Sequence, residues 1–159
     1  MTLHIGDQAP DFELTASDGR TLHLAKLKGK KNVVLYFYPG DFTTVCTRET
    51  CGFRDQYAAL GTLDTEVIGV SVDSDETHRK FTAEYGVPFA LISDSEKKLA
   101  TTYGATSGLV AKLTGSTSRI TYVIDKQGVI AGIFDSMLRA GAHTDGVRQL
   151  IETLAGKSA

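Results

Sequence analysis

The sequence predicts an α/β fold in which a central mixed sheet is flanked by helices. Three observations lead to this prediction. Strand-like runs alternate with helix-like stretches through the middle of the 159-residue chain, an order that is typical of parallel strands connected by helices. The strand-like runs are apolar throughout, as in strands that are buried on both faces. Toward the C-terminus two such runs are separated only by the turn-like residues 125–128, which predicts an antiparallel pair.

The N-terminal part predicts a β-hairpin. Residues 12–14 and 21–24 alternate apolar and polar side chains on either side of Ser17-Asp18-Gly19. An Asp-Gly pair between two alternating runs is typical of a hairpin turn. The next stretch, 26–32, is basic and contains glycine, which indicates a solvated loop in preference to a partner surface.

The remaining strands are expected where β-branched and aromatic residues run together beside turn-forming residues. These runs are 33–38, 66–72, 89–93, 120–124 and 129–134. The last two are joined by Asp125-Lys126-Gln127-Gly128, which predicts a tight hairpin. Apolar residues at helical spacing predict helices from about 43 to 60 and from 142 to 154, and residues 104–118 are rich in Gly, Ser and Thr, as expected of a loop.

Capping residues mark two shorter helices. The first is capped within 73–75 and ends before Gly86. The second is capped by Asp94 or Ser95 and ends near Tyr103. The acidic residues of the first cap could also suggest a cation site, but a helix cap accounts for them better.

The composition excludes several classes of function. The chain has 17 Lys and Arg residues against 19 Asp and Glu residues, a net charge of −2 that gives no electrostatic reason to expect nucleic acid or an anionic membrane as a partner. No apolar run is long enough to cross a bilayer. Residues 1–7 have neither a basic start nor an apolar signal core, so we expect a cytoplasmic protein. No repeat or linker divides the chain, which predicts a single domain over 1–159.

The four histidines do not indicate a metal site. His4, His23, His78 and His143 are scattered, and none has ligand spacing with another histidine or with a cysteine. We therefore expect them on the surface. Two cysteines in a reducing compartment are more often catalytic or metal-binding than structural.

Both cysteines lie in one short stretch, from Pro39 to Cys51. Pro39 and Gly40 end the apolar run 33–38 and helical spacing follows, so Cys46 is expected in the first turn of a helix. The N–H groups of that turn have no partner within the helix, and the positive end of the helix dipole lies there. Such a site can lower the pKa of a cysteine below its usual ~8.5. The alternative is that Cys46 is an ordinary small apolar residue.

Cys51 follows Cys46 by five residues. In a continuous α-helix this separation gives a rise of about 7.5 Å and a Cα–Cα distance of roughly 8.6 Å, beyond the usual ~7 Å limit for a disulfide. A bond between the two sulfurs therefore requires the helix to open locally. This geometry favours a transient catalytic disulfide over a structural one, with a bystander Cys51 as the alternative.

These residues resemble the peroxiredoxins. Pro39-x-x-x-Thr43-x-x-Cys46 is similar to their active-site signature, and Cys46-x-x-x-x-Cys51 followed by Gly52-Phe53-Arg54-Asp55 resembles the Q-type branch, also called bacterioferritin comigratory proteins. The resemblance extends from Asp7-x-Ala9-Pro10-x-Phe12 to the segment 119–125. It implies a thioredoxin-like fold with an additional N-terminal hairpin and an inserted strand and helix.

The resemblance also implies roles for individual residues. Cys46 would be the nucleophile that attacks a hydroperoxide, and Cys51 the resolving thiol. Thr43 would hydrogen-bond to the sulfur or the peroxide, a role compatible with a helix cap. Arg119 matches the second-site arginine of the family, where a guanidinium would favour the thiolate and donate hydrogen bonds to the peroxide. An exposed loop arginine is the alternative.

Residues beside the nucleophile complete the implied site. Pro39 would shield the sulfur and fix the turn, or would simply end the strand. Glu49 lies three residues after Cys46 and would share its helix face, where it could orient Arg119; an exposed glutamate is equally compatible with the sequence. Many Q-type members have Pro-Gly where this chain has Thr44-Val45, so the loop beside the nucleophile departs from the pattern.

By this resemblance the chain is a thiol-dependent peroxidase for hydrogen peroxide and organic hydroperoxides. The implied reaction forms a Cys46 sulfenic acid and then a transient Cys46–Cys51 disulfide, which thioredoxin or a similar dithiol protein reduces. The implied role is antioxidant defence, without a metal, flavin, haem or other cofactor, in a monomer or weak homodimer.

Two alternatives stay open from the sequence. One is a thiol–disulfide oxidoreductase that acts on proteins, although such enzymes usually carry Cys-x-x-Cys and this chain has four residues between its cysteines. The other is a peroxide-sensing redox switch or holdase, which would be oxidised once without sustained turnover.

Overall fold

The computed structural model describes residues 3–42, 44–106, 119–135 and 140–158, and for 44–46, 140–143 and 157–158 the backbone alone. Its main sheet has the strand order β5-β4-β3-β6-β7. The bounds are β3 Asn32–Phe37, β4 Thr65–Ser71, β5 Ala90–Ser93, β6 Ile120–Ile124 and β7 Ile130–Asp135. β3, β4 and β5 run parallel, whereas β6 and β7 are antiparallel to their neighbours. The predicted mixed sheet is therefore confirmed.

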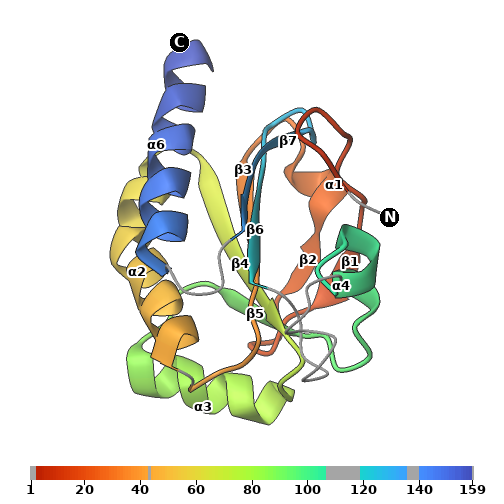
Figure 1. The fold of residues 1–159 in the computed structure, drawn as a ribbon, viewed down its shortest axis with the longest axis vertical. Coiled ribbons are helices and arrows are strands. Elements are labelled where there is room, and N and C mark those ends of the chain that lie inside the picture. Colours follow the sequence, from red (N-terminus) through yellow and green to blue (C-terminus); the bar gives the residue numbers. More distant parts are fainter. Residues whose placement is uncertain (1–2, 43, 107–118, 136–139, 159) are drawn as a thin grey trace.

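Helices lie on both sides of this sheet, as Figure 1 shows. The helices α2 and α6 pack side by side on one face, and α3 lies near the end of β5 where the same apolar core continues. The opposite face is covered by α1, α4 and the hairpin β1–β2. The bounds are β1 Glu13–Thr15, β2 Thr21–His23, α1 Leu24–Leu27, α2 Thr44–Thr62, α3 Asp75–Tyr85, α4 Lys98–Tyr103 and α6 Ala140–Ser158.

The central strand explains why its sequence is apolar without alternation. Side chains of a strand point alternately to the two faces. In β3, Val33 and Leu35 belong to the core beneath α4, whereas Val34 and Tyr36 belong to the core beneath α2. Both faces of β3 are thus buried, and each needs its own apolar side chains.

Local chemistry accounts for the ends of the elements. Ser74 is the N-cap of α3 and accepts a hydrogen bond from the Thr77 N–H at 3.1 Å, and Gly86 ends the helix with φ +62°. Asp94 stabilises the start of α4 from a distance, since its carboxylate accepts the N–H groups of Leu99 and Ala100 at 3.2 and 2.9 Å. The predicted cap of α3 is confirmed. At α4 the N-cap position is Lys97, which makes no side-chain cap hydrogen bond, and Asp94 binds the first N–H groups of the helix from outside it.

The predicted loop at 26–32 is wrong at its two ends. The short helix α1 covers Leu24–Leu27, and Asn32 already pairs with Thr65 in the sheet. Asp11 explains the first difference, because its carboxylate accepts the Ala25 N–H at 3.0 Å and so stabilises a helix start that helical spacing alone does not reveal. The helix expected over 142–154 is longer, from Ala140 to Ser158. Of the loop expected at 104–118, residues 107–118 lie outside the described part.

Candidate active site

The cysteine-bearing stretch leaves the carboxyl end of the central strand. β3 ends at Phe37, a turn follows through Phe42, and α2 begins at Thr44, so Cys46 is the third residue of the helix. The predicted position in the first helical turn is confirmed. Thr43 lies outside the described residues. The backbone N–H groups of this first turn have no acceptor within the helix and offer a site for developing negative charge.

The helix α2 is continuous from Thr44 to Thr62 and therefore contains both cysteines. Cys51 is a free thiol and is half-buried. In a regular helix, residues five apart lie roughly 8.6 Å from each other between Cα atoms. The helix as it stands therefore holds the cysteine pair too far apart for a disulfide.

Arg119 contacts α2 through Glu49, the sixth residue of the helix. It precedes β6, whose first residue Ile120 pairs with Phe37 at the end of β3. Its Nη1 donates a hydrogen bond to Glu49 Oε1 at 2.9 Å, and the side chains of Arg119 and Glu49 are 2% and 0% exposed. The alternative interpretations of the sequence, an exposed Arg119 and an exposed Glu49, are therefore both wrong. The register of β6 on β3 brings together two residues that are 70 positions apart.

The Glu49 carboxyl of this buried pair has a raised pKa. Burial raises the pKa of the Glu49 carboxyl from 4.5 to about 7, and the nearby Arg119 guanidinium acts against this increase. The guanidinium itself stays charged throughout the physiological range. The charge balance beneath the first turn of α2 therefore depends on the protonation of Glu49.

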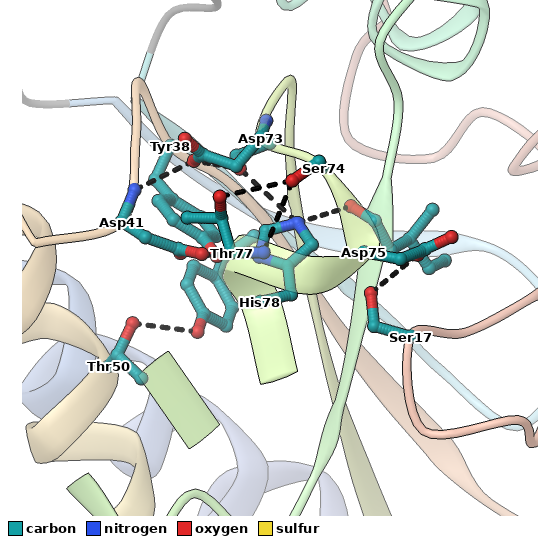
Figure 2. Close-up of polar contacts among 12 residues, drawn as sticks. Ser17, Tyr38, Asp41, Thr50, Asp73, Ser74, Asp75, Thr77 and His78 are labelled. Atoms are coloured by element: carbon teal, nitrogen blue, oxygen red, sulfur yellow. Dashed lines mark hydrogen bonds and ion pairs between the residues drawn. The ribbon is translucent and has the colours of Figure 1, made fainter. Parts of the chain in front are cut away.

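A second buried acid–base pair joins the turn to α3 (Figure 2). His78 of α3 and Asp41 of the turn contact each other at 2.5 Å between Nδ1 and Oδ2, and both side chains are 0% exposed. The prediction that His78 lies on the surface is therefore wrong. Helical spacing was the available signal, because His78 lies three residues before Phe81 and shares its inward face.

Hydrogen bonds connect this pair to the end of β4. The Asp41 N–H donates to Asp73 Oδ2 at 2.7 Å, and the Tyr38 hydroxyl donates to Asp41 Oδ1 at 2.6 Å. The Ser71 hydroxyl donates to the same Asp73 oxygen at 2.6 Å. The turn is thus held through both its backbone and a side chain.

The composition of this group is also one that could bind a metal ion. Among the described residues, Asp41, Asp73 and His78 bring ligand atoms within 4.8 Å of one another. These atoms already take part in the hydrogen bonds of the network, and a metal ion would have to displace several of them. We therefore interpret the group as a structural network around the turn.

The remaining predicted site residue, Pro39, is half-buried and follows the end of β3 by two positions. Phe42, three residues further on, has φ +63°, a left-handed conformation that is costly for a residue with a side chain. Its ring packs against Phe81 and Tyr85 of α3, with centroids 5.1 and 6.2 Å apart. These contacts hold the residue in a conformation that it would not adopt alone.

Comparisons with known proteins agree on one family. The AhpC/TSA family profile matches residues 5–133. The chain is 40% identical over 149 residues to a chloroplastic peroxiredoxin Q of Sedum lineare, covering 94% of this chain and 78% of the relative. It is 44% identical over 130 residues to peroxiredoxin Bcp of Bacillus subtilis, covering 80% of this chain and 82% of the relative.

A solved structure shows the same fold. The crystal structure of peroxidoxin BcpB from Mycobacterium tuberculosis matches with a TM-score of 0.83 and 30% identity, over 94% of this chain and 97% of that one. This match confirms the thioredoxin-like fold with an additional N-terminal hairpin. None of the described helices is long and apolar enough to span a membrane.

Proposed function

Because the chain belongs to the AhpC/TSA family, in its peroxiredoxin Q/Bcp branch, we propose that Cys46 is the nucleophile of its thiol-dependent peroxidase reaction. The family reduces hydroperoxides at the expense of a thioredoxin-like dithiol. The single observation that supports the assignment is the position of Cys46 in the first turn of α2, three residues before Glu49 of the buried Arg119–Glu49 pair. The N–H groups of that turn, which have no acceptor within the helix, favour an anionic sulfur.

The proposed first step is a displacement at oxygen. The Cys46 thiolate attacks one oxygen of the hydroperoxide, an S–O bond forms, and the O–O bond breaks. The electron pair leaves with the second oxygen, which takes up a proton and departs as water or an alcohol. Cys46 becomes a sulfenic acid.

The second step closes the disulfide. The Cys51 thiolate attacks the sulfenic sulfur, and the hydroxyl group leaves with a proton as water. Because both cysteines lie in one continuous helix, residues between them must unwind first. An external dithiol, thioredoxin or a similar protein, then supplies two electrons through a mixed disulfide and restores both thiols.

The surrounding residues act on charge and shape. Arg119 would stabilise the thiolate and the charge that develops on the departing oxygen, with its guanidinium held in place by Glu49. Thr43 would hydrogen-bond to the sulfur or the peroxide. Pro39 would shield the sulfur from water and fix the turn.

Two variants test the assignment. Cys46→Ser should abolish thioredoxin-linked consumption of hydrogen peroxide, and Cys51→Ser should still form one sulfenic acid but should not be recycled by thioredoxin. The readouts are peroxide consumption and the mass of the protein after one equivalent of peroxide. Sustained turnover by Cys46→Ser would remove the proposed nucleophile, and normal recycling of Cys51→Ser would remove the proposed resolving thiol.

The alternative of a protein thiol–disulfide oxidoreductase has less support, because it rests on the fold class, which hosts many activities. The single domain over 1–159, the monomer or weak homodimer and the cytoplasmic location stay predictions. Size-exclusion chromatography with light scattering tests the second of these directly.

A further inference from the structure

The turn that precedes α2 is held from one side by α3 and the segment that leads into it. Asp41 contacts His78 through its side chain and Asp73 through its N–H, at 2.5 and 2.7 Å. Phe42 packs against Phe81 and Tyr85. Each of these partners belongs to α3 or to the residues between β4 and α3.

The same helix also holds the chain beyond the second cysteine. Arg54, three residues after Cys51, donates a hydrogen bond from Nη1 to the Tyr85 carbonyl at 2.7 Å. α3 therefore contacts the reactive segment before Cys46, through Asp41, and after Cys51, through Arg54. The residues that must unwind lie between these two fixed points.

The protons of the His78 ring follow from its acceptors. Nε2 faces the Ile92 carbonyl at 3.1 Å, and a carbonyl oxygen only accepts hydrogen bonds, so Nε2 carries a hydrogen. Nδ1 lies 2.5 Å from Asp41 Oδ2, a hydrogen-bond distance that requires a hydrogen between the two atoms. The ring thus connects a fixed backbone carbonyl of β5 to the turn that leads into α2.

We propose that His78 is a positioning residue for the peroxidase reaction, because its contact with Asp41 fixes the turn that sets where the first turn of α2, and so Cys46, lies. The inference rests on the proposed function of Cys46. A displacement of about 1 Å at a reacting group can reduce a rate by roughly 100-fold. The contact should therefore be visible in the rate of Cys46 oxidation.

Two substitutions of His78 distinguish the hydrogen bond made by Nδ1 from the one made by Nε2. In His78→Asn the amide nitrogen is placed near the position of Nδ1 and can still donate to Asp41. In His78→Gln it is placed near Nε2 and can donate to the Ile92 carbonyl, but the donor to Asp41 is lost. Both variants place a neutral amide at this buried position, and Asn, which keeps the donor to Asp41, is the smaller by one methylene. Packing loss alone would therefore affect His78→Asn more than His78→Gln, the reverse of the order that the lost donor predicts.

The measurement is the second-order rate constant for Cys46 oxidation by hydrogen peroxide, in the full chain by rapid quenching and mass spectrometry. We expect a decrease of about 10-fold or more for His78→Gln, with His78→Asn within about threefold of the unsubstituted protein. Asp41→Asn, which keeps the size of the carboxyl group, should also slow the reaction. Asp94→Asn removes a comparable buried carboxylate that caps α4 on the opposite face, and it should leave the rate unchanged.

A merely structural role predicts a different pattern. Both His78 variants would then lose stability and react at the unsubstituted rate in the folded fraction, and that result would overturn the inference. If a His78 variant does not fold, the comparison of Asp41→Asn with Asp94→Asn decides in the same way. Failure of the unsubstituted Cys46 to react with peroxide would instead contradict the proposed function.

Discussion

Two buried acid–base pairs flank the first turn of α2, and they differ in what they hold. Glu49 and Arg119 lie beneath the helix start, with a charged guanidinium available to the site. Asp41 and His78 lie beside the preceding turn and are enclosed by hydrogen bonds to Tyr38, Asp73 and Ile92. We propose that the first pair acts through charge near the sulfur, whereas the second acts on the position of the backbone.

In the proposed mechanism the reactive thiol has two separate requirements. Its charge depends on the helix terminus and Arg119, and its position depends on a turn attached to another helix. Breaking one pair should therefore produce a different kinetic signature from breaking the other.

The largest effect is expected from Arg119→Met. This change removes the guanidinium and leaves the Glu49 carboxyl buried without it. Loss of one donor that stabilises a developing anion costs about 10²- to 10³-fold in rate, and we expect a decrease of this size in Cys46 oxidation. Arg119→Lys is the matched control, since it keeps the charge without the planar fork. A wild-type rate for Arg119→Met would contradict a role of the guanidinium at the site.

Glu49→Gln should change how stability depends on pH. The pKa of Glu49 is 4.5 in the unfolded chain and about 7 in the folded one. Between these values the unfolded state loses its proton first, so the folded state binds more protons and the free energy of unfolding decreases as pH rises. The decrease amounts to roughly 3 kcal/mol between pH 4.5 and 7, and it ends above pH 7.

Urea denaturation at several pH values measures this slope in the unsubstituted protein and in Glu49→Gln. The variant should lack this contribution in the same window. A slope of equal size in both proteins would show that the burial of Glu49 is not its cause.

Combining Glu49→Gln with His78→Gln tests whether the two buried pairs act independently on Cys46. We expect Glu49→Gln to slow Cys46 oxidation as well, because the Arg119 guanidinium loses its carboxylate partner. If the pairs act independently, the decreases of the two variants should multiply, because well-separated effects add in free energy. A combined decrease well below this product would mean that the two pairs act through one shared rearrangement.

The smallest effect is expected from Ser74→Ala at the start of α3. Loss of the N-cap should reduce the free energy of unfolding by about 1 kcal/mol, as measured by urea denaturation. The rate of Cys46 oxidation should change less than threefold, since the His78 contact with Asp41 is retained. A rate loss as large as that of His78→Gln would mean that the whole of α3, and not His78 in particular, positions the turn.

The sequence predicted most of the fold because its patterns are local. The apolar run of β3, the Asp-Gly turn of the hairpin and the cap at Ser74 each depend on neighbouring residues, and each is present in the structure. The helix α1 was missed because its start is stabilised by Asp11, which is distant in sequence from the Ala25 N–H that it accepts.

Residues of the candidate site could be predicted only where they belong to a sequence motif. The motif assigned roles to Cys46, Cys51 and Arg119 that stay predictions. The spacing to Cys46 suggested the contact between Glu49 and Arg119, which the structure contains. The Asp41–His78 contact was missed because its partners are 37 residues apart and only the fold brings them together. A histidine without a known partner is predicted to lie on the surface, because burying it unpaired is costly. The partner of His78 is Asp41, in the turn that precedes α2.

The proposed peroxidase mechanism depends most on a lowered pKa of the Cys46 thiol at the start of α2. The most direct test is the pH dependence of alkylation of Cys46 in the Cys51→Ser variant, where Cys46 is the one remaining cysteine of the sequence. We expect a thiol pKa at least one unit below the ~8.5 of free cysteine. A value at or above that of free cysteine would contradict the account.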